Sequence, residues 1–221
     1  MELIVTGAQR SGTTIMQELI NLHPWAKILT ESHHPMRFDG MFDEEYREEF
    51  LREGYPSFWS MCNNHSGEVN RSVLVKSLCA SVRSQWWWYR VFGDKSPAYC
   101  FHWKRVRALW PQCHIIAMVR DLDECAASIQ KCWWGNDDID ICSRKVKEYN
   151  EALVGCPGLH VVSLDDLKRE TGIVMAEILD WLSLPIEIYP LNKCIDIVSG
   201  PNINPPISEN PYKVVADGKN S

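Results

Sequence analysis

The N-terminal segment constrains the fold more than any other part of the chain, because a short apolar run leads directly into a glycine-containing loop and then a helical pattern. Leu3–Thr6 is typical of a buried strand, and Thr13–Leu22 carries apolar residues at helical spacing until His23 and Pro24 end the pattern. The loop Gly7–Thr14 reads GAQRSGTT. This order predicts the first unit of an α/β fold, with the loop at the carboxyl end of its strand.

The rest of the chain repeats this alternation and predicts one domain. Further strands are expected at Lys27–Thr30, Arg90–Phe92, His114–Val119 and Leu159–Leu164. Helices are expected at Asp43–Arg52, Val69–Arg83 and Ala98–Trp110, from about Asp123, near Ile141–Leu153 and at Leu167–Leu182. We therefore expect a three-layer α/β/α domain over residues 1–221, with a mostly parallel sheet of about five strands. Residues 40–90 are expected to form an insertion, and residues 186–221, rich in Pro, Asn and Ser, an irregular closing tail.

Composition excludes some classes of partner. The 29 acidic side chains outnumber the 23 basic ones, and a net charge of −6 argues against a nucleic-acid partner.

The nine cysteines form no CxxC pair and no Cys/His group at zinc spacing, so we expect free thiols and no metal site. Without a signal sequence or a membrane-spanning run, a cytoplasmic location is expected. The oligomeric state stays open.

The Gly7–Thr14 loop has the features of a phosphate site. Backbone amides of such a loop, together with the positive end of the following helix, hold phosphate oxygens. The GxxxxG spacing is nearly that of a Walker A loop, but Thr13 stands where its lysine belongs and Arg10 adds a cation inside the loop. A small-molecule kinase is therefore the less favoured alternative, and a non-catalytic nucleotide-binding module also stays open.

Gln9–Thr14, followed by the apolar helix and His23-Pro24, resembles the 5′-phosphosulfate loop of sulfotransferases that use 3′-phosphoadenosine 5′-phosphosulfate (PAPS). The similarity runs from about residue 2 to about residue 187 and is closest in style to bacterial and carbohydrate-type members. It implies a sulfotransferase domain in which the loop binds the 5′-phosphate and the sulfuryl group. The binding residues that it implies are Arg10, Ser11, Gly12, Thr13 and Thr14.

Two further segments resemble sulfotransferase elements. Arg120-Asp121, with Ser128 eight residues after the arginine, is similar to the 3′-phosphate element, although Leu122 replaces the usual proline. The resemblance implies that Arg120 and Ser128 bind the 3′-phosphate. Lys95-Ser96-Pro97 resembles the family's Lys-[Thr/Ser]-Pro segment, which implies that Lys95 stabilises charge on the transferring group.

A general base is expected after the second strand. Glycan sulfotransferases place a glutamate there, which favours Glu31. The other candidates are His33 and His34, with His33 placed second because its pKa needs no tuning. The catalytic residues would then be Glu31, Lys95 and Arg10, or His33 in place of Glu31.

The implied reaction moves a sulfuryl group from PAPS to a hydroxyl or amine by in-line displacement, without a metal, and releases adenosine 3′,5′-bisphosphate. The acceptor would be a small molecule, a glycan or a lipid, with residues 40–90 on its side of the site. The tryptophans at 86–88 and 133–134 either stack on that acceptor or fill the core.

Overall fold

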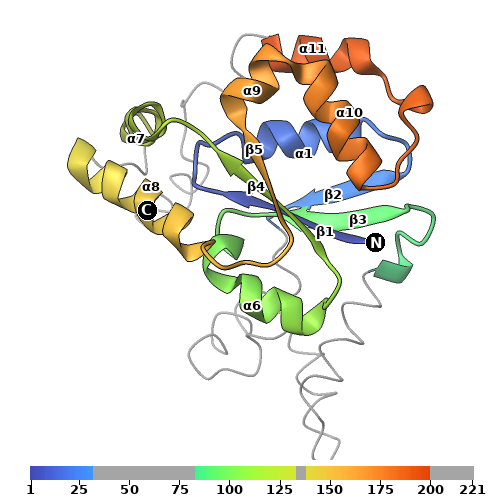
Figure 1. The fold of residues 1–221 in the computed structure, drawn as a ribbon, viewed down its shortest axis with the longest axis horizontal. Helices are drawn as coiled ribbons and strands as arrows, with labels where there is room; N and C mark the ends of the chain where they lie inside the picture. Colours follow the sequence, from blue (N-terminus) through green and yellow to red (C-terminus); the bar gives the residue numbers. More distant parts are fainter. Residues whose placement is uncertain (32–82, 133–137, 200–221) are drawn as a thin grey trace, which may run out of the picture.

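The computed structural model describes residues 1–31, 83–132 and 138–199, and these ranges form a parallel sheet between two layers of helices (Figure 1). The sheet has five strands in the order β2-β3-β1-β4-β5, and each neighbouring pair is parallel. The strands are β1 (Glu2–Gly7), β2 (Ala26–Thr30), β3 (Val91–Lys95), β4 (His114–Val119) and β5 (Leu159–Ser163). The expected α/β architecture is confirmed.

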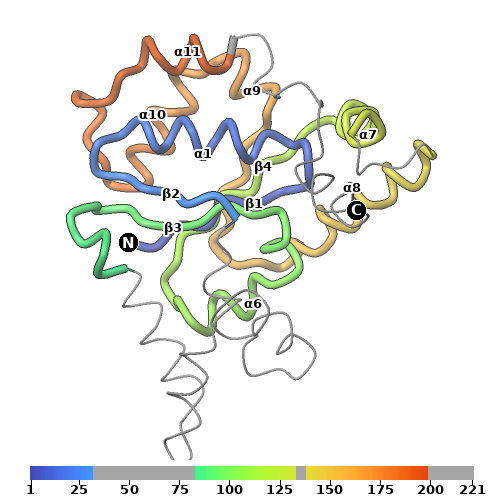
Figure 2. Tube along the Cα trace, turned by 180° about the vertical axis from the view of Figure 1, so that it is seen from behind, coloured from blue at the N-terminus to red at the C-terminus, as the bar shows by residue number. Residues whose placement is uncertain are grey.

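Helices cover both faces of the sheet. The first layer contains α1 (Thr13–Asn21), α9 (Leu164–Arg169), α10 (Thr171–Trp181) and α11 (Leu191–Ser199). On the opposite side lies α6 (Tyr99–Leu109), whereas α7 (Leu122–Gln130) and α8 (Ile139–Ala152) pack on each other at one end of the sheet. Seen from behind, α11 lies beside α1 although the two are far apart in the sequence (Figure 2).

The core follows the two-residue period of the strands. In β1, Leu3 and Val5 join the cluster beneath α1 and α10, whereas Ile4 packs on the α6 side. β4 divides in the same way, because Ile116 joins the first cluster and Ile115 the second. A central strand buried on both faces explains why its sequence is continuously apolar.

Side chains of α1 close the outer edge of β2. Asn21 accepts a hydrogen bond from the Ile28 amide at 2.6 Å and donates one to the Ile28 carbonyl at 2.9 Å. The Gln17 amide donates to the same carbonyl and to the Thr30 hydroxyl. These bonds satisfy the backbone of an edge strand, and they fix the end of β2 against the helix that follows the glycine loop.

Two predicted elements near the C-terminus were wrong. The helix expected at Leu167–Leu182 is two helices, because Ser163 caps an earlier start and the backbone at Glu170 is not helical. The start of the expected irregular tail instead forms a 3-10 turn, η1 (Ile186–Ile188), and then α11. Tyr189, between η1 and α11, holds this segment against α1, because its hydroxyl donates to the Leu19 carbonyl at 2.8 Å.

Some other predictions differ from the structure or fall outside the described ranges. β3 is longer than predicted and ends at Lys95. The helix expected at Asp43–Arg52 and nearly all of that at Val69–Arg83 lie outside the described residues. All seven cysteines within them are free, and no helix there is long and apolar enough to span a membrane.

Candidate active site

Two glycines shape the loop between β1 and α1. Gly7 has a φ of 142°, and a Cβ there would lie 2.3 Å from the Met118 carbonyl oxygen. Gly12 has a φ of 97°, and a Cβ there would lie 2.7 Å from Leu164. Between them, the buried Ser11 donates its hydroxyl to the Ala8 carbonyl at 2.7 Å. The loop is therefore a tight turn that has no room for a side chain at Gly7 or Gly12.

The N-terminus of α1 is open to an anion. Gly12 is its N-cap and supplies no side-chain hydrogen bond, and the first turn contains no acidic residue. Thr13 is buried and Thr14 is exposed at this end of the helix. An uncapped N-terminus with its positive dipole favours phosphate or sulfate oxygens.

An ion pair joins the ends of β2 and β3. The Lys95 ammonium donates to Glu31 Oε1 at 2.8 Å, and the Glu31 amide donates to the Lys95 carbonyl at the same distance. The Lys95 side chain is only 4% exposed, whereas that of Glu31 is 51% exposed. Glu31 also has a φ of 47°, an uncommon backbone state for a residue other than glycine and one that clusters at functional sites. The structure thus brings together two of the predicted catalytic residues.

The loop and the ion pair face the same cavity of about 400 Å³. It is lined by Gln9, Arg10, Thr13, Thr14, Glu31, Lys95, Ser96, Pro97, Ala98 and Tyr149. Tyr149 comes from α8, where its ring packs on Phe101 of α6. Burial raises the pKa of Tyr149, with smaller contributions from the nearby negative charges, Glu31 among them.

The other predicted binding residues meet at the edge of the loop. Arg10, with a φ of 70°, donates from Nε to the Ser128 hydroxyl at 3.0 Å. Its carbonyl accepts a long hydrogen bond of 3.4 Å from the Arg120 guanidinium. Arg120 also donates twice to Glu124 Oε2, at 2.8 and 3.2 Å. Arg10, Arg120 and Ser128 therefore form one connected group.

Sequence reasoning missed several residues that support the site. The Cys125 thiol donates to the Gln9 carbonyl at 3.1 Å, and burial raises its pKa to about 11, which keeps it protonated. Gln17 is a buried polar residue on the apolar face of α1, a signal that could have indicated a hydrogen-bonding role. Tyr149 and Glu124 carried no such signal, because their roles depend on how α7 and α8 pack.

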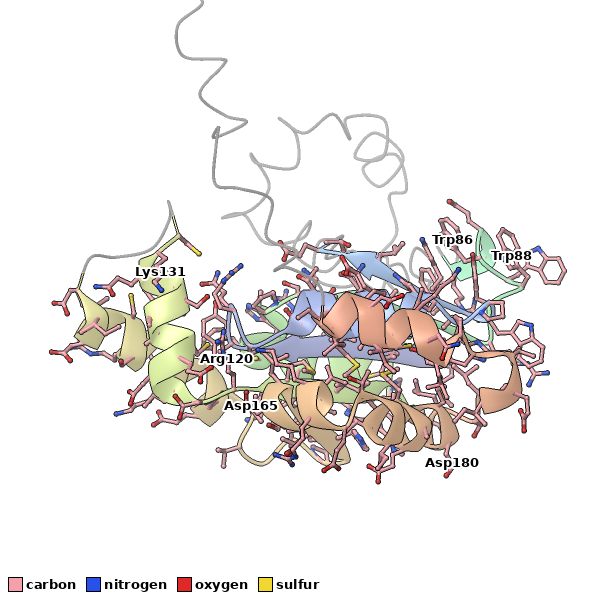
Figure 3. All side chains as sticks on the ribbon, turned by 90° about the horizontal axis from the view of Figure 1, so that it is seen from above. Trp86, Trp88, Arg120, Lys131, Asp165 and Asp180 are labelled. Atoms are coloured by element: carbon pink, nitrogen blue, oxygen red, sulfur yellow. The ribbon has the colours of Figure 1, made fainter. Side chains whose placement is uncertain are left out.

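The remaining candidates either lie outside the described residues or lie away from the cavity. His33 and the tryptophans at 133–134 lie outside the described residues. Trp86 and Trp88 lie at the end of the molecule opposite Arg120 (Figure 3), so they form no wall of the cavity. Trp86 packs on Phe92, and Trp87 is 76% exposed. Within the described ranges, no group of His, Cys, Asp and Glu could hold a metal ion.

Comparison with known proteins gives the family. The profile of the sulfotransferase family matches residues 2–187, which include all the residues of the site. The chain belongs to the sulfotransferase family. No curated protein matches this sulfotransferase significantly in sequence.

Solved structures share the fold of this sulfotransferase at low sequence identity. The sulfotransferase domain of the Synechococcus PCC 7002 olefin synthase has a TM-score of 0.61 and 15% identity, over 94% of this chain and 90% of that one. The sulfotransferase domain from the curacin biosynthetic pathway has a TM-score of 0.58 and 14% identity, over 83% and 74%. Sulfotransferase STF9 from Mycobacterium avium has a TM-score of 0.57 and 13% identity, over 91% and 68%. These similarities support the fold, and they carry no information about the acceptor.

Proposed function

We propose that this chain transfers a sulfuryl group from PAPS to a hydroxyl or amine of an acceptor. The observation that carries the proposal is that a buried lysine paired to a glutamate faces the same cavity as an uncapped helix N-terminus. One side of that cavity suits an anion, and the other offers a carboxylate for the proton of an attacking group.

The residues present fit PAPS. The α1 N-terminus and Arg10 would hold the 5′-phosphate and the sulfuryl group, and Arg120 with Ser128 would hold the 3′-phosphate. Arg10 connects the residues proposed for the 5′-phosphate with those proposed for the 3′-phosphate, since its side chain contacts Ser128 and its carbonyl contacts Arg120. PAPS supplies the activated sulfuryl group and a 5′-phosphate as the leaving group. With a net charge of −6, the protein must attract this anion through local cations and amides.

Glu31 and Lys95 have complementary roles in the proposal. Lys95 occupies Oε1 of the Glu31 carboxylate and orients it, which leaves Oε2 to accept the proton of the acceptor hydroxyl or amine. The Lys95 ammonium, held in a nearly water-free position, stabilises negative charge as it develops on the leaving oxygen. His33 remains the alternative candidate for the general base.

In this proposal the acceptor lies beside Tyr149 and Pro97, which line the same cavity as the ion pair. We propose a small molecule or a glycan or lipid hydroxyl rather than a long acidic polymer, because the chain carries an excess of acidic residues.

A binding experiment tests this function directly. Calorimetric titration with adenosine 3′,5′-bisphosphate in the absence of metal should give saturable binding, whereas ATP with magnesium should not. Arg10→Ala should weaken the binding. Arg90→Ala is the matched control, because Arg90 lies at the other end of β3 and stacks on Trp25 with its guanidinium carbon 3.8 Å from the ring centre. Magnesium-dependent ATP binding without bisphosphate binding would instead indicate a kinase.

Turnover is then measured as adenosine 3′,5′-bisphosphate released from PAPS with pooled hydroxyl and amine acceptors. Release above the acceptor-free rate supports the enzyme. Binding of the bisphosphate with no acceptor-dependent release from any pool would favour a non-catalytic binding module.

A further inference from the structure

The guanidinium of Arg120 already has an anionic partner in this structure. Its Nε and one terminal nitrogen both donate to Oε2 of Glu124, at 3.2 and 2.8 Å. The two residues are four apart, and the side chains are 19% and 56% exposed respectively. A carboxylate therefore occupies the hydrogen-bonding edge with which an arginine recognises phosphate.

The Glu124 side chain is not needed to cap the N-terminus of α7. The helix is capped by Asp121, whose carboxylate accepts hydrogen bonds from the amides of Asp123 and Glu124, at 3.0 Å each. The Glu124 side chain takes no part in this cap and instead accepts hydrogen bonds from Arg120. Asp123 lies beside it in the same helical turn, and within the described residues its side chain makes no hydrogen bond or ion pair with Arg120.

We infer that Glu124 is an affinity-determining residue that competes with the 3′-phosphate of the nucleotide for Arg120. The inference rests on the proposed function, in which Arg120 holds that phosphate. To bind it, the guanidinium must exchange a carboxylate oxygen for phosphate oxygens, while its other terminal nitrogen keeps its contact with the Arg10 carbonyl. The contact to Arg10 keeps the guanidinium beside the loop during the exchange.

The exchange lowers the affinity for every nucleotide that carries a 3′-phosphate. PAPS and its product share this group, so Glu124 weakens the binding of both and aids release of the product. A nucleotide without a 3′-phosphate does not need the exchange, and its affinity is independent of Glu124. Because both members of the pair reach solvent, the expected effect is modest and falls with added salt.

The test measures dissociation constants for adenosine 3′,5′-bisphosphate and for adenosine 5′-monophosphate at low salt. Glu124→Gln removes the charge and keeps the side-chain shape, and we expect it to tighten bisphosphate binding about threefold. The monophosphate constant should not change. Asp123→Asn is the matched control, since it removes one negative charge from the same turn of α7 and should leave both constants as they are.

A double-mutant cycle tests whether the effect passes through Arg120. In an Arg120→Ala background, Glu124→Gln should no longer tighten bisphosphate binding. The inference is overturned if Glu124→Gln leaves the dissociation constant of the bisphosphate unchanged. It is also overturned if Glu124→Gln tightens the binding of both nucleotides equally, or if Asp123→Asn tightens bisphosphate binding as much as Glu124→Gln does. Either result would show only the loss of one negative charge near the site, without competition for Arg120. Each of these outcomes leaves the proposed function intact, whereas failure of the wild-type chain to bind the bisphosphate would remove both.

Discussion

The site contains two ion pairs of the same length in different surroundings. Lys95 and Glu31 are 2.8 Å apart and join the ends of two neighbouring strands, 64 residues apart in the chain. Arg120 and Glu124 are also 2.8 Å apart but lie four residues apart, the glutamate in the first turn of α7. The lysine side chain is 4% exposed, whereas the arginine side chain is 19% exposed.

This difference assigns different tasks to the two cations. A charge removed from water interacts more strongly with neighbouring charges, and a fixed position costs no rearrangement when charge develops during a reaction. Lys95 meets this description and is suited to catalysis. Arg120 has solvent beside it and a partner that can turn away, so it is suited to exchanging one anion for another.

The largest effect is expected from Glu31→Gln, which removes the proposed base and keeps the shape of the side chain. We expect acceptor-dependent sulfuryl transfer to fall by about 10² to 10⁴, since general bases contribute on this scale. Bisphosphate affinity should change little, and calorimetry on the same preparation checks this. Full turnover by this variant would transfer the role of base to His33.

Removing the cation from the same pair with Lys95→Met should have the next largest effect. The apolar stem still fills its buried position, but the ammonium that stabilises the leaving oxygen is lost. We expect the transfer rate to fall by about 10² to 10³. A rise in KM for PAPS with kcat unchanged would contradict the assignment, because it would make Lys95 a binding residue like Arg120.

Arg120→Ala should affect binding and spare the reaction chemistry. Charge-assisted hydrogen bonds to phosphate contribute about 1.5 to 3 kcal/mol, so the affinity for adenosine 3′,5′-bisphosphate should fall by about 10- to 100-fold. The affinity for the 5′-monophosphate should be nearly unchanged, and titrating both nucleotides measures the difference. An equal loss for both would show that Arg120 acts through the 5′ side of the loop.

The sequence predicts those parts of the fold and site that depend on the succession of neighbouring residues along the chain. Leu3–Thr6 followed by a glycine loop predicts a buried strand and its ligand-binding end, and the later strands follow by the same pattern. Lys95 could be assigned to the end of a strand. Its burial and its contact with Glu31 could not, since both depend on the parallel register that aligns Thr30 with Lys95.

What the sequence did not predict depends on packing between distant elements. Tyr149 reaches the cavity because α8 packs against α6, and Cys125 meets the loop because α7 lies beside it. The α11 helix was missed because its Pro- and Asn-rich surroundings indicate a loop, while its position depends on Tyr189 and on Cys194, buried in the main core. Such contacts are tertiary and leave no periodic signal.

The smallest expected effect is on the dependence of stability on pH, and it arises near the amino end of β2, away from both pairs. His23 is fully buried, accepts from the Trp25 amide at Nδ1 and therefore donates from Nε2 to the Pro185 carbonyl. Burial lowers its pKa, the Pro185 carbonyl partly opposes this, and the charge of Arg90 lowers it further.

Because the folded state then binds a proton less tightly than the unfolded state, the contribution of His23 to stability is complete above about pH 6.5 and is lost as the pH falls from there toward the lowered value. Denaturant unfolding at pH 7.5 and pH 5.5 should show this loss, and His23→Asn should reduce it. His114, whose pKa burial also lowers, accounts for a remaining part and is tested with His114→Asn. Equal losses in the wild type and His23→Asn would exclude His23 as a source. If the assignment holds, variants of the two ion pairs are best compared above pH 6.5, where the contribution of His23 to stability is complete and does not change with pH.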